Sequence, residues 1–203
     1  MTYESMMLIP APGDVLHVRT RGLVANRIRS VTGANHNHDA ILCHSKDGKL
    51  SVYNERWPHS RLDVFDEYIR SLNRAGGSWV LTRPKWAIEQ DDWELHDWRM
   101  WISVIARAME GNYYPISNIW AVYKAKRKWA RWVPFGTPND KAYFCSAAVR
   151  QIMISNKVNP WVPAAVKDEA LAAPIHWARA VRDGDMRIIA HYGRLIESIG
   201  DIQ

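Results

Sequence analysis

The stretch "HDAILCHSKDGKLSVYNE" occupies residues 38–55. It opens with "HDAILC", a short apolar run that has a polar start, and continues through the turn signal "KDGK". The last part, "LSVYNE", alternates polar and apolar side chains with period two. The pattern predicts a β-hairpin over residues 38–55.

On both sides of this hairpin, strand and helix patterns follow one another. Alternation or apolar runs predict strands over residues 14–19, 78–84 and 186–192. Apolar spacing and stop signals predict helices over residues 22–33, 61–77, 91–109, 116–132, 146–154 and 173–181. Early strands, intervening helices and a late strand are typical of an α+β domain with a largely antiparallel sheet packed against helices.

Composition indicates one globular domain spanning residues 1–203. Hydrophobic residues make up 47% of the chain and charged residues 24%, which excludes a disordered protein. Eleven tryptophans lie between Trp57 and Trp177. We also expect the domain to carry a helical, Trp-rich elaboration around residues 85–135.

The net charge is +6 and the isoelectric point is about 9.4. This balance suits an acidic partner such as an anionic membrane surface, a bacterial envelope polymer or a nucleic acid, and it does not choose among them. Basic proteins without a nucleic-acid role are common, so a nucleic-acid partner is disfavoured. The run "KAKRKWARW", Lys124–Trp132, is the candidate contact for an anionic surface, and the alternative is a solvated helix whose tryptophans pack inward.

The N-terminus has neither a basic start nor an apolar run of signal-peptide length, and no stretch approaches the roughly 18 apolar residues of a membrane span. We expect a protein that is cytoplasmic as synthesised, without excluding export by another route. The two cysteines, Cys43 and Cys145, argue against a disulfide framework.

The sequence gives little support for a metal site or a nucleotide-binding site. The cluster "HNHDAILCH" offers four candidate zinc ligands, His36, His38, Cys43 and His44. Their spacing fits no standard zinc pattern, and adjacent strand residues point to opposite faces, so the four should not converge. The chain has no P-loop lysine after glycines and no GxGxxG. We predict neither a metal nor an organic cofactor.

A cysteine and a histidine form the better candidate site. In "KAYFCSAAVRQIM", residues 141–153, Cys145 stands just before a predicted helix, where the backbone N–H groups and the helix dipole favour a thiolate. His38 opens a predicted strand, and Asn54 ends the row of the partner strand that it shares with Leu50 and Val52. A cysteine hydrolase needs a thiolate, an imidazole and a polar group that orients the ring. A buried cysteine and a structural histidine remain the alternative interpretation.

These residues resemble the circularly permuted branch of the NlpC-type papain-like cysteine peptidases, the YiiX/YebB-like group, in which the histidine precedes the cysteine. The matching motifs are an opening Gly13–Asp14, "TGANHNHDAI" around His38, "GNYY" from Gly111, "FCSAAV" around Cys145 and "APIHWA" around Pro174. They span residues 13 to about 180 in the family's order.

The resemblance implies a papain-like fold with Cys145 as nucleophile, His38 as base and Asn54 as the orienting residue. The chain departs from the family at Asp39 and Ala40, where a hydrophobe and a glycine are usual. The third position is commonly Glu, and Glu55 lies one step from Asn54. Asn is acceptable in papain-like chemistry, so the departure weakens the assignment of that residue more than that of the activity.

The resemblance implies hydrolysis or acyl transfer at an amide or ester carbonyl, with peptidoglycan stem peptides as the leading substrate. A lipid-acyl substrate is the alternative within the same fold, and a phage origin would favour the cell wall. Two other classes stay open, a non-catalytic interaction module and a basic nucleic-acid binder.

Overall fold

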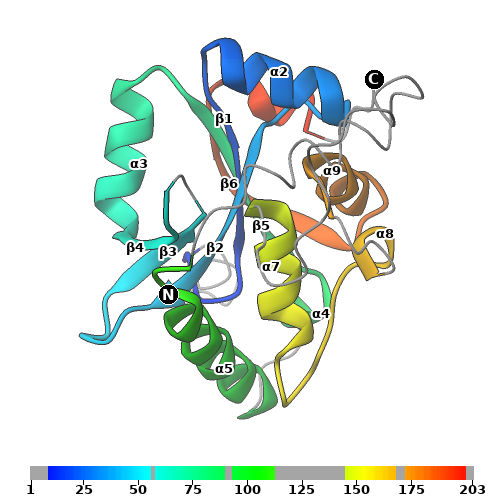
Figure 1. The fold of residues 1–203 in the computed structure, drawn as a ribbon. Coiled ribbons are helices and arrows are strands. Elements are labelled where there is room, and N and C mark those ends of the chain that lie inside the picture. The colour runs from blue at the N-terminus through cyan, green and yellow to red at the C-terminus, as the bar shows by residue number, and fades with distance from the viewer. Residues whose placement is uncertain (1–8, 56–57, 90–92, 113–144, 168–171, 200–203) are drawn as a thin grey trace, which may run out of the picture.

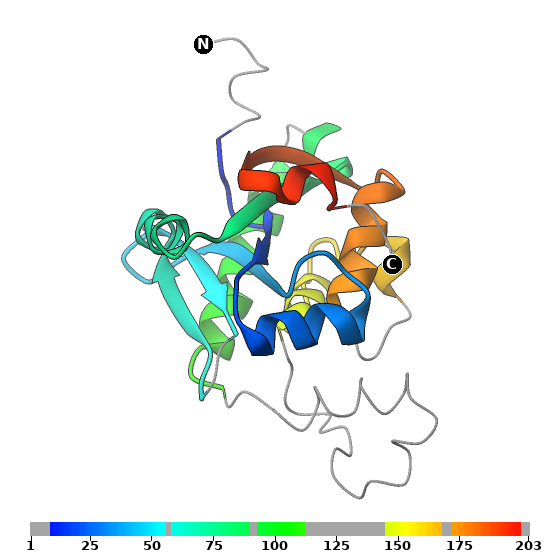
Figure 2. The ribbon, with the colours of Figure 1, turned by 90° about the horizontal axis from the view of Figure 1, so that it is seen from above.

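The computed structural model describes residues 9–55, 58–89, 93–112, 145–167 and 172–199. Its centre is a six-stranded sheet in the order β4-β3-β2-β1-β5-β6, with every neighbouring pair antiparallel. Figures 1 and 2 show helices on both sides of this sheet, with α3 on one side and α7 and α9 on the other. The predicted α+β architecture is therefore confirmed.

The hairpin predicted over residues 38–55 forms two adjacent strands of the sheet. Ile41 lies opposite Tyr53, and Leu42 lies opposite Val52. The strands are β1 (Val15–Arg19), β2 (His38–His44), β3 (Leu50–Asn54), β4 (Arg61–Val64), β5 (Ser78–Pro84) and β6 (Met186–Tyr192).

The predicted helices that lie among the described residues begin and end near their predicted bounds, with one difference, whereas the short helices α4, α8 and η2 were not predicted. Residues 61–64 were expected to start a helix, but they pair with β3 as the edge strand β4, and α3 begins only at Phe65. The helices are α2 (Leu23–Thr32), α3 (Phe65–Arg74), α4 (Trp86–Glu89), α5 (Trp93–Met109), α7 (Cys145–Ile154), α8 (Ala164–Lys167), α9 (Pro174–Arg182) and the 3₁₀ helix η2 (Gly193–Glu197).

The helix expected over residues 116–132 and the basic run Lys124–Trp132 lie outside the described residues. So does most of the Trp-rich elaboration expected around residues 85–135, of which the structure describes α4, α5 and their flanks. Within the described ranges, no helix has the length and apolar character that a bilayer crossing requires.

The sheet separates two apolar layers because successive residues of a strand point to opposite faces. Val15, Ile41 and Tyr53 face the layer formed with α5, α7 and α9. Their strand neighbours Leu16 and Val52 face the layer formed with α3. The same alternation sets the face of the sheet on which each polar side chain of the candidate site lies.

The Gly13–Asp14 motif anchors the start of β1. Gly13 has φ +92°, and a Cβ there would lie 2.1 Å from the Trp98 ring, so the position requires glycine. The buried Asp14 carboxylate accepts two hydrogen bonds from Arg83, at 2.7 Å from Nε and 2.8 Å from Nη2. This bidentate pair ties the start of β1 to the end of β5.

Candidate active site around Cys145, His38 and Asn54

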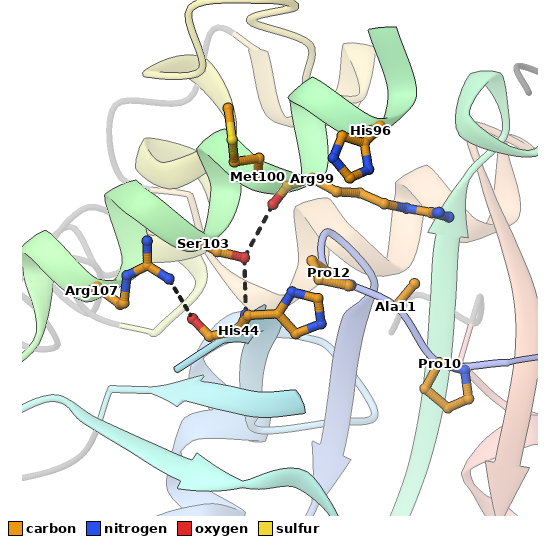
Figure 3. A pocket seen from close by; sticks show the side chains of 9 residues that line it. All are labelled: Pro10, Ala11, Pro12, His44, His96, Arg99, Met100, Ser103 and Arg107. Carbon is orange, nitrogen blue, oxygen red and sulfur yellow. Dashed lines mark hydrogen bonds between the residues drawn. The ribbon is translucent and has the colours of Figure 1, made fainter. Parts of the chain in front are cut away.

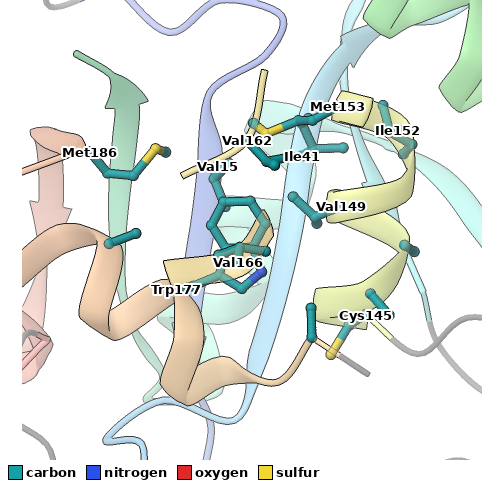
Figure 4. Packing of buried hydrophobic residues seen from close by; sticks show 14 of the residues in the cluster. Val15, Ile41, Cys145, Val149, Ile152, Met153, Val162, Val166, Trp177 and Met186 are labelled. Atoms are coloured by element: carbon teal, nitrogen blue, oxygen red, sulfur yellow. The ribbon is translucent and has the colours of Figure 1, made fainter. Parts of the chain in front are cut away.

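Cys145 is the first residue of α7, where the helix packs on the sheet. Figure 4 shows it at the end of the helix, with Val149 and Ile152 further along. The thiol is 5% exposed and accepts a hydrogen bond from the backbone N–H of Asp39. Its sulfur also lies 3.9 Å from the Ser146 hydroxyl oxygen.

The register of the sheet explains why the Asp39 N–H reaches the sulfur. Leu42 N–H donates to the β1 side, at Asp14 O, so alternation directs the Asp39 N–H toward the β3 side. Because Ile41 faces Tyr53, residue 55 would be the partner of Asp39, but β3 ends at Asn54. The Asp39 N–H is therefore not paired within the β2–β3 ladder, and it donates to the thiol.

The surroundings of Cys145 correct one expectation from the sequence. A helix N-terminus was expected to lower the pKa of the thiol. Instead, burial together with the Asp39 carboxylate raises the pKa of Cys145 to about 12, and the hydrogen bonds from Asp39 and Ser146 offset only part of this. The thiol is therefore protonated near neutral pH, and a base must remove its proton before it can attack.

His38 and Asn54 lie in direct contact. The His38 Nε2 is 2.7 Å from Asn54 Oδ1, and Asn54 Nδ2 donates to Asp63 Oδ2 at 3.0 Å. Since an ionised carboxylate only accepts, Asp63 turns the amide nitrogen of Asn54 toward itself and the oxygen toward the imidazole. The His38 Nε2 then carries a proton, which leaves Nδ1 as the basic nitrogen of the neutral ring.

The structure places the predicted residues on two sides of one strand end. His38 and Asn54 share the α3 face with Val52, whereas the Asp39 side chain faces α7. Cys145 approaches from the α7 side, next to the Asp39 amide. The imidazole is therefore on one face of the sheet, at His38, and the thiol is on the other face, next to the following residue, Asp39.

Behind the thiol lies a buried polar cluster that sequence reasoning missed. Asp39 Oδ1 is 2.7 Å from both His17 Nδ1 and His36 Nε2, and Asp39 Oδ2 accepts from the Ser146 hydroxyl at 2.5 Å. His17 Nε2 is in turn 2.9 Å from the Thr82 hydroxyl. Burial alone would raise the pKa of Asp39, but the two imidazoles and their hydrogen bonds outweigh it and hold that pKa well below its usual range.

The cluster has the donor types of a metal site but fits one poorly. One ligand atom from each of His17, His36 and Asp39 lies within 4.8 Å of the other two, a set that suits zinc or iron. A metal-bound histidine, however, normally donates its second N–H to a partner, and His36 Nδ1 has none among the described residues. Hydrogen bonds account for the cluster more completely, with His36 donating from Nε2 and its buried Nδ1 left as a lone pair.

Of the four residues weighed for zinc in the sequence, only His36 belongs to this cluster. His38 lies with Asn54, Cys43 is buried among apolar side chains, and His44 is exposed at the far end of β2. The useful signal was His17, a histidine in the middle of the apolar run "DVLHVR". Its partner Asp39 lies directly opposite on β2, a pairing that only the register of the two strands defines.

Glu55 points to the same face as Tyr53 and away from Asn54. The Tyr53 hydroxyl donates to Glu55 Oε1 at 2.5 Å, and Glu55 Oε2 is buried without a partner in the described part of the chain. Burial raises the pKa of Glu55 to about 7, although the hydrogen bond from Tyr53 acts in the opposite direction. This geometry ties Asn54, and not Glu55, to the His38 ring.

A separate pocket of about 420 Å³ lies at the other end of β2, beside α5 and the lead Pro10–Pro12 (Figure 3). His44 N–H donates to the Ser103 hydroxyl, and Arg107 donates to His44 O. His38 and His44 are the two ends of a seven-residue strand, so roughly 20 Å separates this pocket from the candidate site.

The fold belongs to the α+β class in which an antiparallel sheet packs against helices in a papain-like arrangement. It is similar to the crystal structure of the metalloprotein YiiX from Escherichia coli O157:H7, with a TM-score of 0.59 and 16% sequence identity. The match covers 91% of this chain and 99% of YiiX, and at this identity it establishes the fold alone. No family model and no curated protein sequence matches the chain.

Proposed function

We propose that the protein is a cysteine hydrolase or acyltransferase that uses Cys145 as nucleophile, His38 as base and Asn54 as the residue that orients the base. One observation carries the proposal: the thiol at the start of α7 is held by the amide of Asp39, the residue that follows His38 on β2. The YiiX-like fold supports it, because that fold accommodates both the helix and the strand that the chemistry needs.

In the proposed reaction, His38 Nδ1 takes the thiol proton as Cys145 Sγ bonds to the substrate carbonyl carbon. For this transfer the ring must approach the thiol past the end of β3, where no further β3 residue pairs with Asp39. When the tetrahedral intermediate collapses, the C–N or C–O bond breaks and His38 returns the proton to the leaving group. Water then attacks the thioester carbonyl carbon while His38 takes a proton of that water. The C–S bond breaks, the carboxylic acid is released, and His38 returns the proton to the Cys145 sulfur.

The protonated state of Cys145 makes the base essential. Because the pKa of the thiol is raised to about 12, few molecules carry a thiolate near neutral pH without a base. The Cys145 N–H, at the first residue of α7, is the proposed donor to the oxyanion. Asp63 supports the role of His38 as base indirectly, since it fixes the amide of Asn54 and through it the imidazole tautomer.

We propose an amide of a peptidoglycan stem peptide as the substrate, on the strength of the motif resemblance. The test is digestion of purified muropeptides, with products identified by mass spectrometry. The wild type and Cys43→Ala should release the same new termini, whereas Cys145→Ala should release none. The same samples are offered a phospholipid ester, so that cleavage of the ester alone redirects the proposal to lipid-acyl chemistry. Equal cleavage by wild type and Cys145→Ala would overturn it.

A further inference from the structure

A second hollow, of about 840 Å³, lies at the end of the sheet where β1 and β6 end and β5 begins. Figure 1 shows α2, η2 and the connection from α3 to β5 gathered at this end. Four arginines line the hollow, which we call the arginine pocket: Arg19, Arg21, Arg29 and Arg194. Its volume is in the range of small-molecule sites.

The charge of the arginine pocket is not balanced by acidic groups. None of its lining residues is an aspartate or a glutamate, and within the described ranges none of the four arginines forms an ion pair. Among the described residues, Arg29 donates to neutral oxygens alone, at Thr20 O and at the side-chain amides of Asn26 and Asn37. Burial and the neighbouring Arg19 both lower the pKa of Arg29, as expected where like charges gather.

We propose that the arginine pocket binds a phosphate-bearing organic ligand. Guanidinium groups match phosphate oxygens in bidentate pairs, and several cations around one hollow favour an anion with more than one charge. The hollow exceeds the size of inorganic phosphate and so has room for an organic part. Tyr192, half exposed and stacked on Trp79 with ring centroids 6.4 Å apart, provides a flat wall for it.

The pocket is distinct from the candidate active site but touches the same strand. Thr20 N–H and Arg29 Nη1 both donate to Asn37 Oδ1, at 2.9 and 3.1 Å, and Asn37 immediately precedes β2. None of the four arginines belongs to the site around Cys145, His38 and Asn54. The proposal therefore stands or falls independently of the hydrolase activity.

The test is isothermal titration with inorganic pyrophosphate at constant ionic strength. Arg21→Gln/Arg194→Gln is the informative variant, because both side chains are exposed and neither forms a hydrogen bond within the described residues, so the fold should be unaffected. Saturable 1:1 binding by the wild type should weaken about ten-fold or more in this variant. The matched control, Arg70→Gln/Arg74→Gln on α3, removes two exposed cations whose Nε atoms donate only to backbone oxygens, and should keep the wild-type affinity.

A second assay, compared with the pyrophosphate titration, separates the two sources of the phosphate. Sedimentation with phosphatidylcholine vesicles containing phosphatidic acid tests a lipid headgroup, and pyrophosphate tests a soluble ligand. Arg21→Lys/Arg194→Lys keeps the charge but removes the paired N–H donors of the guanidinium groups, and it should also weaken binding. If binding in either assay depends on Arg21 and Arg194, the result supports the arginine pocket as a phosphate site and identifies the ligand as soluble or as a lipid headgroup. If neither assay shows binding, or if both show equal binding by the glutamine variant and the wild type, the proposal is wrong.

Discussion

The backbone amide of Asp39 donates a hydrogen bond to the sulfur of Cys145, while the carboxylate of the same residue raises the pKa of that thiol. One residue thus stabilises a thiolate through its main chain and opposes it through its side chain. The side chain itself is held by His17, His36 and Ser146. The reactivity of Cys145 should therefore respond to changes in this cluster.

Replacing the charge of Asp39 should make Cys145 more reactive. In a Cys43→Ala background, Asp39→Asn keeps the backbone donor and removes the like charge, so the pKa of Cys145 should fall. Burial, the larger cause of the raised pKa, remains. Because the thiolate is the reactive form, iodoacetamide alkylation at pH 8 should accelerate by about ten-fold. The control Asp66→Asn, an exposed carboxylate on α3, should leave the rate unchanged. Slower alkylation of Cys145 in the Asp39→Asn variant would contradict this electrostatic explanation.

Asn54 should matter more for turnover than Glu55. Asn54→Ala removes the acceptor that fixes the His38 ring and should lower kcat by about 10- to 1000-fold with the fold intact. Glu55→Gln should change kcat far less, because Glu55 contacts Tyr53 on the other face. Asp63→Asn should lower kcat by about ten-fold, since the amide of Asn54 is then free to flip. Steady-state kinetics decide, and the reverse ranking of Asn54 and Glu55 would show that the wrong side chain has been assigned.

Glu55 should make the protein less stable as the pH rises toward neutrality. Burial raises its pKa from 4.5 to about 7 in the folded state, so between these values the folded protein holds a proton that the unfolded chain has released. The free energy of unfolding then falls as the pH rises from about 4.5 to 7 and levels off above that range. Glu55→Gln lacks this titration, so its stability relative to wild type should rise by about 2–3 kcal/mol between pH 5 and 8. Urea unfolding at both pH values tests it, and parallel pH profiles would refute the raised pKa.

Gly13 should tolerate no side chain. Gly13→Ala forces a Cβ to within 2.1 Å of the Trp98 ring at a positive φ, and should destabilise the fold by at least about 3 kcal/mol. Gly48→Ala is the matched control, because its φ is also positive but nothing lies within 4 Å, so it should cost only about 1 kcal/mol. Equal losses in urea unfolding would mean that Trp98 does not pack on Gly13.

Local sequence patterns predicted the central elements of the fold but not their cross-strand contacts. The hairpin of residues 38–55 has a turn signal and alternation, and both features depend only on neighbours in the sequence. The edge strand Arg61–Val64 was taken for the start of α3 because it runs directly into a strong helical pattern, and only pairing with β3 identifies it.

In the candidate site, too, the sequence predicted residues that stand in recognisable motifs but not the contacts between strands. The motif resemblance selected His38, Asn54 and Cys145, and the structure places the first two in contact. The cluster of His17, His36 and Asp39 was not predictable, because His17 and Asp39 meet through the register of two strands 22 residues apart. The raised pKa of Cys145 was missed for a related reason, since the burial of a thiol depends on tertiary packing and not on its place in a helix.

Trapping the acyl-enzyme shows directly whether Cys145 is the nucleophile. The protein is incubated with p-nitrophenyl acetate, quenched in acid and digested, and the acetylated residue is identified by peptide mass spectrometry. The account predicts a single thioester on Cys145 in the wild type, loss of that adduct in Cys145→Ser, and much slower formation in His38→Ala. Acetylation of Cys43 or Ser146 in place of Cys145, or equal formation in wild type and His38→Ala, would contradict it.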